Sequence, residues 1–491
     1  MSWKNLFTGK TPPGIDLKYI NEQLQDCPDI KQKKVYLDNK QEAFFFYIAG
    51  LTDADLLQRD FINPVVAMGL NQLSSETSIH NLPCNEVTLL YDSKAVLDDL
   101  MRGNTVFVCT ALPFAVSCSI SSIEKRSIDE PETEKNIRGP HEGFVEPMDT
   151  NLAILRRKIK NNRLKFKTLT LGVQTNQKVA IAYIEGVANI EIVNSLFEKI
   201  SKIEIDGLSA IGYVEQLITS HPYSLFPQYL ATERPDKAMA ALLEGRMVIL
   251  QEGTPVVLIA PVSFVSFFQA LDDYSTSWIH GSFLRIVRIT AVSLAVILPS
   301  LYIAITSFHY YVVPLNLLIP LAESRAKVPF PPIIEVLILE AIVEMIREAA
   351  VRLPTYIGTA ISVFASLVIG QAAVEAGIVS NLLIIIVGAS AVASYVIPSF
   401  DMAMAIRILR FFFTLASSIF GIIGIVICFG LTLVHLVSME SIGQPYFLPV
   451  APLSINGFKD TILRLPIKAM GKRPSITKTK NMSRGNNNGR K

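Results

Sequence analysis

The sequence contains few of the residues that build metal and redox sites. Only five cysteines, six histidines and two tryptophans occur among 491 residues. The cysteines are odd in number and have no metal-ligand spacing, and the histidines are scattered, whereas a metal site needs several ligands that converge. We therefore expect no metal, and we expect buried free thiols in a reducing compartment. The cysteines are Cys27, Cys84, Cys109, Cys118 and Cys428.

Motifs that carry catalysis are also missing. The chain has no GxGxxG, HExxH or CxxC sequence, and the GKT at residues 9–11 lacks the upstream glycine of a phosphate-binding loop. The basic run 154–167 could meet nucleic acid or lipid headgroups, but a solvated helix face is the more ordinary explanation. The sequence predicts no catalytic residue, no cofactor and no nucleic-acid partner.

A secretory signal is missing as well, because the opening MSWKNLFTGKTPPG has no apolar core. Long uncharged runs begin only near residue 285, so we expect the first 280 residues to stay on the cytoplasmic side. The mean hydropathy of +0.38 averages a polar half and an apolar half. Four apolar segments have the length that crosses a bilayer, and they are residues 287–307, 356–374, 378–399 and 411–437.

The polar half has the pattern of an α/β protein. Residues 42–51, 104–112 and 115–120 are rich in aromatic and β-branched residues and predict strands. Thr52 is the expected N-cap of the helix that follows the first of these. The segment 127–143 has almost no apolar content and predicts a linker between two subdomains.

A second strand-rich region follows this linker. Two strands, a helix and a further strand at 203–208 are expected, and then a helix closed by Gly245 and a hairpin that turns at Glu252 and Gly253. The predicted fold class is an α/β soluble N-terminal region of two subdomains followed by an all-α multi-span membrane domain. The predicted domains are 1–130, 144–280, 285–440 and a basic C-terminal tail, 441–491.

The stretch 328–375 is unusual for an apolar half-chain. Residues 332–353 predict an amphipathic helix with Glu340, Glu344 and Glu348 on one arc. Ionisable groups near membrane depth are costly unless they are paired or face water. The arc fits an interfacial helix with ion pairs such as Glu344–Arg347 and Glu348–Arg352, or an acidic ring in an oligomer.

The segment after this helix carries a stripe of small and polar residues. Its face contains Thr359, Ser362, Ser366 and Gly370. Small residues four positions apart allow close helix packing, and they also line narrow pores. From the residues alone both interpretations stay open.

The number of crossings follows from charge. The basic tail places the C-terminus on the same side as the N-terminal half, which requires an even number of spans. Four crossings satisfy this rule if the 332–353 helix is interfacial or re-entrant. The cost of this topology is that Arg407 and Arg410 then lie on the outer side.

Five ordered blocks are distributed along nearly the whole chain. They are RGPHEGFVEPMDTNLAILRRKI (138–159), HPYSLFPQYLATERPDKAMAALLEGRMVILQEGTPVVLIAP (221–261), VPFPPIIEVLILEAIVEMIREAAVRLP (328–354), IGQAAVEAGIVS (369–380) and RILRF (407–411). These blocks resemble one known family, the A subunits of the GerA-family germinant receptors of bacterial endospores. Leu225 departs from the proline that the family often has at this position.

The resemblance implies a three-part receptor in the bacterial spore inner membrane, with the soluble region on the spore-core side. A permease-like B subunit that senses nutrient and a lipoprotein C subunit are the implied partners, beside membrane lipid. The A subunits are expected to form a homo-oligomeric ring that acts as a nutrient-gated channel for monovalent cations. Thr359, Ser362, Ser366 and Gly370 are then the candidate pore-lining residues, and Glu340, Glu344 and Glu348 the candidate pore mouth.

Two other function classes remain as alternatives. A secondary transporter or a non-conducting scaffold subunit is the first, although transporters commonly show internal repeats and none is convincing between 287–374 and 378–437. A membrane-bound enzyme is the second, and it lacks any catalytic constellation. The oligomeric state separates the ring from the transporter.

Overall fold

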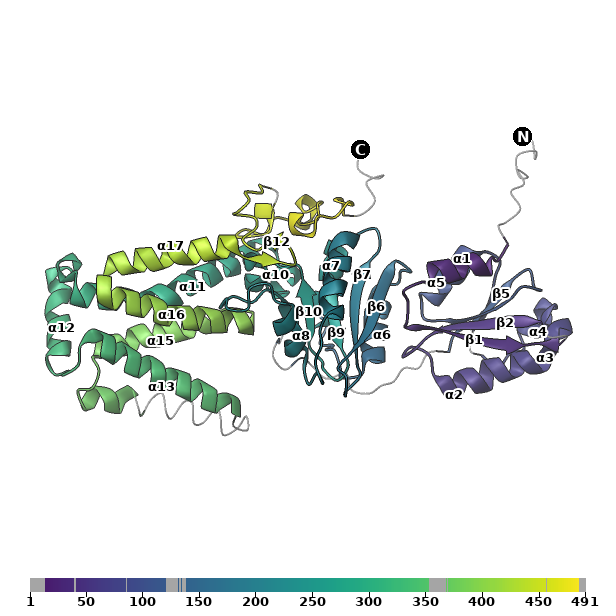
Figure 1. Ribbon diagram of the computed structural model, residues 1–491, viewed down its shortest axis with the longest axis horizontal. Helices are drawn as coiled ribbons and strands as arrows, with labels where there is room; N and C mark the ends of the chain where they lie inside the picture. The colour runs from purple at the N-terminus through teal and green to yellow at the C-terminus, as the bar shows by residue number, and fades with distance from the viewer. Residues whose placement is uncertain are drawn as a thin grey trace. The chain divides into compact units, whose positions relative to one another are not determined.

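The computed structural model describes residues 14–38, 41–84, 86–120, 131, 134, 138–352, 368, 370–455 and 457–484 (Figure 1). The chain divides into two compact units. The first contains Met1–Thr219, Ala231–Pro261 and Lys472–Lys491, and the second contains Ser220–Leu230 and Val262–Gly471.

The first sheet of the first unit has the strand order β1-β2-β4-β5-β3, with antiparallel neighbours. Its strands confirm the three predicted segments in this region. They are β1 (Ile30–Tyr36), β2 (Glu42–Ile48), β3 (Val87–Leu90), β4 (Thr105–Cys109) and β5 (Ala115–Cys118). The helical elements around them are α1 (Leu17–Gln23), α2 (Ala54–Leu56), η2 (Leu57–Ile62), α3 (Asn63–Leu73), α4 (Glu76–Ile79) and α5 (Ser93–Leu100).

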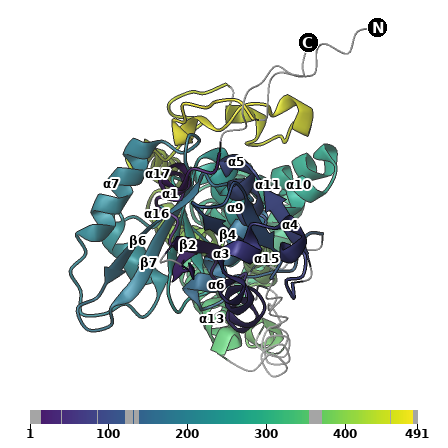
Figure 2. The ribbon, with the colours of Figure 1, turned by 90° about the vertical axis from the view of Figure 1, so that its right-hand side faces the viewer.

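Both faces of this sheet are buried, because successive side chains of a strand point to opposite faces. Phe45 and Phe107 pack on the side of η2 and α3, whereas Phe46, Val106 and Val108 pack on the side of α1 and α5 (Figures 1 and 2). Helix α2 is capped by Asp53, whose carboxylate accepts hydrogen bonds from the backbone N–H groups of residues 55 and 56. The predicted cap, Thr52, is therefore wrong by one residue.

The second sheet has the order β6-β7-β9-β10-β8. The predicted helix end at Gly245 (φ 90°) and the hairpin at Glu252 and Gly253 are confirmed. Its elements are α6 (Met148–Lys158), β6 (Leu164–Leu171), β7 (Gln177–Ile184), α7 (Ile190–Ser201), α8 (Ile211–Ile218), β8 (Leu230–Thr232), α9 (Pro235–Glu244), β9 (Met247–Gln251) and β10 (Val257–Ala260).

The strand predicted at 203–208 is wrong. Its carbonyl groups accept hydrogen bonds from the turn after β6, with Val173 N donating to Ile205 O and Gln174 N donating to Asp206 O. These carbonyl groups are bonded to a turn and not to a neighbouring strand, so the segment does not join the sheet.

The basic run is only partly a solvated face. Arg156 is buried, and its Nε and Nη2 donate to the two carboxylate oxygens of Asp29 at 2.8 and 3.0 Å. Lys165 Nζ donates to the carbonyl oxygens of Gln23 and Gln25, each at 2.7 Å. These two side chains hold the segment before β1 against the second sheet. The prediction of a solvated face is therefore wrong for Arg156 and Lys165.

The cysteines differ from the expectation of free thiols throughout. Cys84 and Cys118 form a disulfide, because the pairing of β3 with β5 brings the start of one strand beside the end of the other. Cys27 and Cys109 are buried free thiols, and burial raises the pKa of both. Cys428 is also free.

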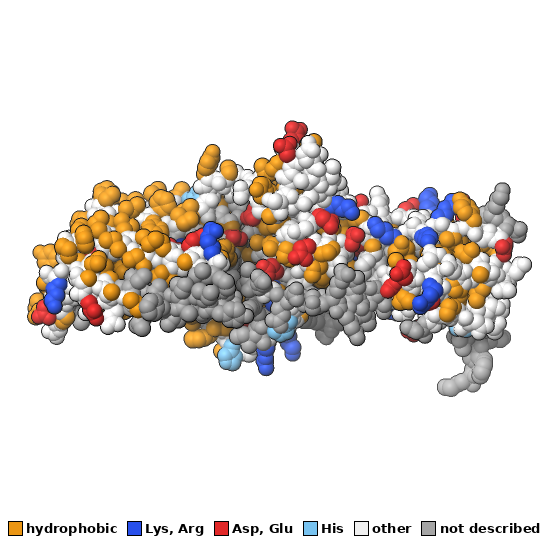
Figure 3. Space-filling view, turned by 90° about the horizontal axis from the view of Figure 1, so that it is seen from below, with side chains coloured by type: hydrophobic (Ala, Val, Ile, Leu, Met, Phe, Trp, Pro, Cys, Tyr) orange, Lys and Arg blue, Asp and Glu red, His pale blue; other side chains and the backbone are white. Residues whose placement is uncertain are grey.

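The second unit is mainly helical. Its helical elements are η3 (Phe264–Phe268), α10 (Asp272–Ser275), α11 (Trp278–Ser307), η4 (Tyr310–Val312), α12 (Leu315–Ala326), α13 (Pro332–Arg352), α15 (Asn381–Tyr395), α16 (Phe400–Phe420) and α17 (Ile422–Ser438). Within the described residues α11 and α16 are long and apolar enough to cross a membrane, and α15 and α17 are shorter apolar helices. Apolar side chains cover much of the surface over these helices (Figure 3).

Two predicted apolar segments differ in detail from the structure. Residues 411–437 do not form one helix, because a turn at Gly421 (φ 62°) separates α16 from α17. The helix within 378–399 is confined to residues 381–395. Most of the segment 356–374 lies outside the described residues.

The C-terminal residues are packed and do not form a free extension in the part that is described. They contain β11 (Glu440–Ser441), β12 (Gln444–Pro445) and the short helices η5 (Gly457–Lys459), η6 (Ile467–Ala469) and η7 (Ser475–Thr477). Arg464 is buried in the second unit, and Ile476 and Thr477 are buried in the first.

Candidate functional site: a buried cluster of glutamates and arginines

Helix α13 carries the acidic residues into the helical unit. It begins at Pro332, whose missing N–H costs nothing in a first turn. Glu335, on its first turn, is fully buried and accepts from the backbone N–H of Ser380 at 3.3 Å. Arg325 of α12 lies 3.5 Å from the same carboxylate. The apolar face of α13 packs on α11 and α15 through Val336 and Leu339.

Glu340 is fully buried and pairs with an arginine from another helix. Its Oε1 lies 3.1 Å from Nε of Arg410 on α16, and the two side chains are 0% and 1% exposed. Arg410 also donates from Nη1 to Ser390 Oγ on α15 at 3.4 Å. This pair joins three helices in an apolar surrounding, where an unpaired charge would be strongly unfavourable.

Glu344 is the centre of the cluster, because three arginines converge on it. Arg347, Arg407 and Arg410 approach its carboxylate at 3.4, 3.3 and 3.3 Å. Its side chain is 30% exposed, so the carboxylate also has access to solvent. The cluster thus contains the two glutamates Glu340 and Glu344 and three arginines.

Arg347 is positioned from α15. Its Nε donates to Tyr395 Oη at 3.0 Å, its Nη2 donates to Ser394 Oγ at 3.2 Å, and its guanidinium lies 4.5 Å from the centre of the Tyr395 ring. The helix pair α13 and α15 is therefore fixed by polar contacts as well as by apolar packing.

Glu348 differs from the other two predicted acids. It is 62% exposed and pairs with Arg352 of the same helix at 2.6 Å. The predicted pairs Glu344–Arg347 and Glu348–Arg352 are both confirmed. Of the three candidate mouth residues, Glu348 is the one whose carboxylate is accessible over most of its surface.

The predicted stripe is described at one position. Thr359, Ser362 and Ser366 lie outside the described residues. Gly370 is helical, and a Cβ added to it would meet no atom within 4 Å among the described residues.

The partners of the acidic arc are what sequence reasoning missed. Arg407 and Arg410 entered the sequence argument only as a difficulty for the topology. The available signal was their complementarity: two arginines three positions apart in one apolar segment, and two glutamates four positions apart in another, each on one helix face. No group of His, Cys, Asp and Glu in the described part of the chain could hold a metal.

These features combine an N-terminal region of two sheets with helices and a helical unit that encloses ion-paired charges. In the described part of that unit, two helices have the length and composition to cross a membrane. The chain belongs to the GerA family of spore germination proteins. The family model described as "Bacillus/Clostridium GerA spore germination protein" matches residues 18–476. The resemblance noted from the sequence blocks is thereby confirmed.

Two known proteins of Bacillus subtilis are similar in sequence to this chain over more than nine tenths of its length. The chain is 38% identical over 464 residues to spore germination protein KA of Bacillus subtilis (strain 168), covering 93% of this chain and 85% of that protein. It is 36% identical over 473 residues to the uncharacterized membrane protein YfkQ of the same organism, covering 96% and 91%. A crystal structure of the N-terminal domain of the A subunit of the Bacillus megaterium spore germinant receptor GerK3 is 27% identical, covers 52% of this chain and 99% of that chain, and has a TM-score of 0.38.

Proposed function

We propose that this chain is a germinant-receptor A subunit whose copies assemble in the spore inner membrane into a gated channel for monovalent cations. A permease-like B subunit and a lipoprotein C subunit are its proposed partners, with the soluble region on the spore-core side. The observation that carries the proposal is the set of glutamates on α13 inside an apolar helical unit. Ionisable groups at such positions commonly mark ion pathways, and rings of acidic side chains favour cations.

The three glutamates have different roles in this proposal. Glu340 and Glu344, tied to Arg407 and Arg410, fix α13 against α16. Glu348 is exposed on the next turn and, repeated around a ring, supplies the acidic mouth. The stripe from Thr359 to Gly370 lines the passage beyond it. A nutrient signal needs to favour the open ring over the closed ring by only a few kcal/mol to switch it.

The test is conductance of the intact receptor. Full-length chain, purified with its partner subunits and reconstituted in vesicles, should conduct K⁺ and Na⁺ in preference to Cl⁻. Glu348→Gln should lower this cation preference several-fold, because it removes one charge per subunit from the mouth. Glu323→Gln is the matched control, since Glu323 is an exposed acid on α12 and not on α13.

The outcomes separate the alternatives. An assembled oligomer without conductance would leave the scaffold subunit as the better explanation. A monomer that exchanges a solute across the vesicle membrane would favour the secondary transporter. Equal effects of the two substitutions would remove Glu348 from the mouth.

A further inference from the structure

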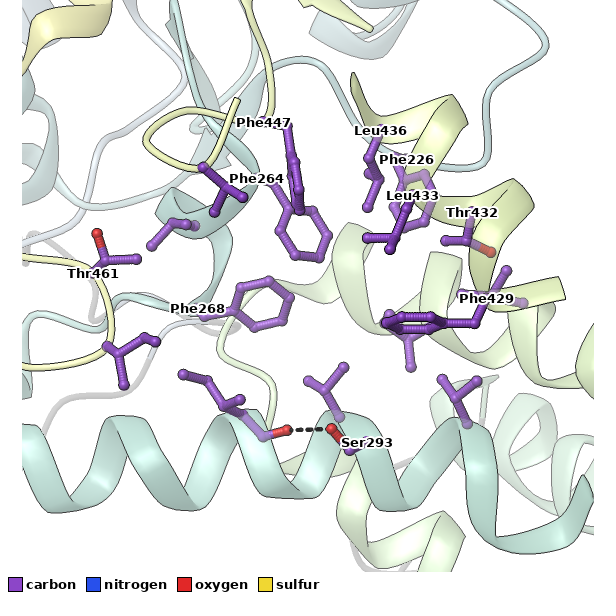
Figure 4. Close-up of a pocket in the computed structure, with 18 of the residues that line it drawn as sticks. Phe226, Phe264, Phe268, Ser293, Phe429, Thr432, Leu433, Leu436, Phe447 and Thr461 are labelled. Atoms are coloured by element: carbon purple, nitrogen blue, oxygen red, sulfur yellow. Dashed lines mark hydrogen bonds between the residues drawn. The ribbon is translucent and has the colours of Figure 1, made fainter. Parts of the chain in front are cut away.

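A cavity of about 340 Å³ lies within the helical unit, among α11, α16, α17, η3 and the C-terminal segment (Figure 4). Its volume is within the ordinary range of ligand pockets, about 300–1,000 Å³. Phe264 and Phe268 of η3, Phe429 of α17 and Phe447 of the C-terminal segment point into it (Figure 4).

Three of the described lining residues carry hydroxyl groups, and each hydroxyl donates to the carbonyl oxygen four positions earlier, as Thr461 Oγ1 does to Gly457 O at 2.8 Å. Ser293 Oγ donates to Ile289 O at 3.1 Å, and Thr432 Oγ1 donates to Cys428 O at 2.8 Å. Along most of its length the described lining therefore offers contacts mainly for an apolar molecule.

One end of the cavity is charged. Arg285 lines it with a side chain that is only 2% exposed. Its Nε donates to Asp273 Oδ2 at 3.1 Å and its Nη1 to Asp460 Oδ1 at 2.7 Å. Its Nη2 is buried with no hydrogen-bond partner in the described part of the chain.

A second unpartnered donor lies in the same arginine cluster. Arg464 donates from Nη1 to the carbonyl oxygens of Asp273 and Thr276, while its Nε is buried without a partner among the described residues. The guanidinium groups of Arg285 and Arg464 lie 5.4 and 5.3 Å from the centre of the Tyr274 ring. Buried cationic donors without acceptors are costly, and the acceptors that suit guanidinium are carboxylate and phosphate oxygens.

The cavity is also elongated along α11. Its lining on this helix runs from Arg285 through Val292 to Ile297, an interval of twelve residues and so about 18 Å. Among the described lining residues Arg285 is the one charged side chain, and it stands at the start of this run, whereas most of the others, such as Phe413, are apolar. A polar end and a long apolar body fit one acyl chain next to an anionic head.

We propose that this cavity is a binding site for an anionic amphiphile, with an acyl chain among the phenylalanines and a phosphate or carboxylate head at Nη2 of Arg285. The head is supplied by an acidic phospholipid of the surrounding bilayer or by a free fatty acid. The site does not depend on ion conduction, and it stands if the chain conducts nothing.

The test measures bound lipid on the full-length chain. Delipidated protein in detergent is mixed with dioleoylphosphatidylglycerol, dioleoylphosphatidylcholine or oleate, and native mass spectrometry counts the molecules retained per chain. An anionic probe should be retained in preference to phosphatidylcholine by at least about tenfold in affinity. Retention of phosphatidylglycerol alone identifies the phospholipid as the source, and retention of oleate alone identifies the fatty acid.

Two matched pairs of variants locate the site. Val292→Trp fills the cavity and should abolish the retention, whereas Val287→Trp on the same helix lies outside the lining and should not. Arg285→Gln should remove the preference for the anionic head, whereas Arg288→Gln, which loses a bond to the same Asp273 but does not line the cavity, should keep it. If Arg285→Gln does not fold, the tryptophan pair decides.

Two results would overturn the proposal. One is equal retention of phosphatidylcholine and phosphatidylglycerol with no retention of oleate. The other is a Val292→Trp protein that retains the anionic probe as well as Val287→Trp does.

Discussion

At the scale of single residues, the buried ion pair of Glu340 and Arg410 is the contact in the helical unit whose disruption we expect to lower stability most. Both side chains are inaccessible, and removal of Arg410 would leave the Glu340 carboxylate as an uncompensated buried charge. The pair of Glu348 and Arg352 has similar chemistry but is exposed, so water competes for both charges. Because both glutamates belong to α13, the buried pair and the exposed pair can be compared directly.

Arg410→Ala is expected to lower the free energy of unfolding by about 3–5 kcal/mol, because it leaves Glu340 charged and buried without a partner. Arg352→Ala, the control on the exposed pair, should cost no more than about 0.5 kcal/mol. Reversible unfolding of the full-length protein in detergent measures both. Similar losses for the two variants would mean that the Glu340 carboxylate reaches water or another cation.

At the scale of the element, the turn at Gly421 decides how α16 and α17 pack. Its φ of 62° is a conformation that other residues rarely adopt, and an added Cβ would lie 3.2 Å from two carbon atoms of Phe308. The turn makes two helices from one uninterrupted apolar segment. It also allows α17 to return along α16 and to form one wall of the cavity with Phe429.

Gly421→Ala is expected to destabilise the helical unit by about 1–3 kcal/mol, the cost of a strained backbone residue. Gly430→Ala is the matched control, because Gly430 is inside α17 and an added Cβ meets nothing within 4 Å. That change should be neutral or stabilising by about 0.5–1 kcal/mol. Thermal unfolding compares the two, and an unaffected Gly421→Ala protein would show that the turn tolerates a side chain.

At the scale of the whole molecule, the first unit is discontinuous in sequence. Residues 472–484 return to it more than two hundred residues after β10 and bury Ile476 and Thr477. Arg473 Nε donates to Leu243 O at 2.9 Å, and Arg484 Nη2 donates to Glu244 Oε1 at 2.6 Å. The chain's last described segment is therefore part of the soluble fold, and it carries basic residues that sequence reasoning treated as a tail.

Truncation after Gly471 is expected to destabilise the first unit by at least about 1.5–3 kcal/mol, the value of one fully buried apolar side chain such as Ile476. Truncation after Arg484 keeps all these contacts and is the control. Limited proteolysis of the soluble region, followed over temperature, measures the difference. Identical protease resistance of the two truncated proteins would contradict the structural role of this segment.

The sequence by itself determined the features that local pattern controls. The aromatic run in EAFFFYI indicated β2, and proline with an apolar arc indicated α13. The i,i+3 and i,i+4 spacings indicated the Glu344–Arg347 and Glu348–Arg352 pairs. Glycine fixed the end of α9 at Gly245, since only glycine adopts its φ at little cost. The blocks of family sequence determined the class of protein.

Only the tertiary structure decided which distant residues meet. Glu340 and Arg410 are seventy positions apart, and Cys84 reaches Cys118 only because β3 pairs with β5. Residues 203–208 match the local pattern of a strand, but their carbonyl groups bond to the turn after β6. Residues 411–437 match the pattern of one long apolar helix, but the turn at Gly421 divides them. Periodicity reports which face of an element is buried, but it contains no information on which other element covers that face.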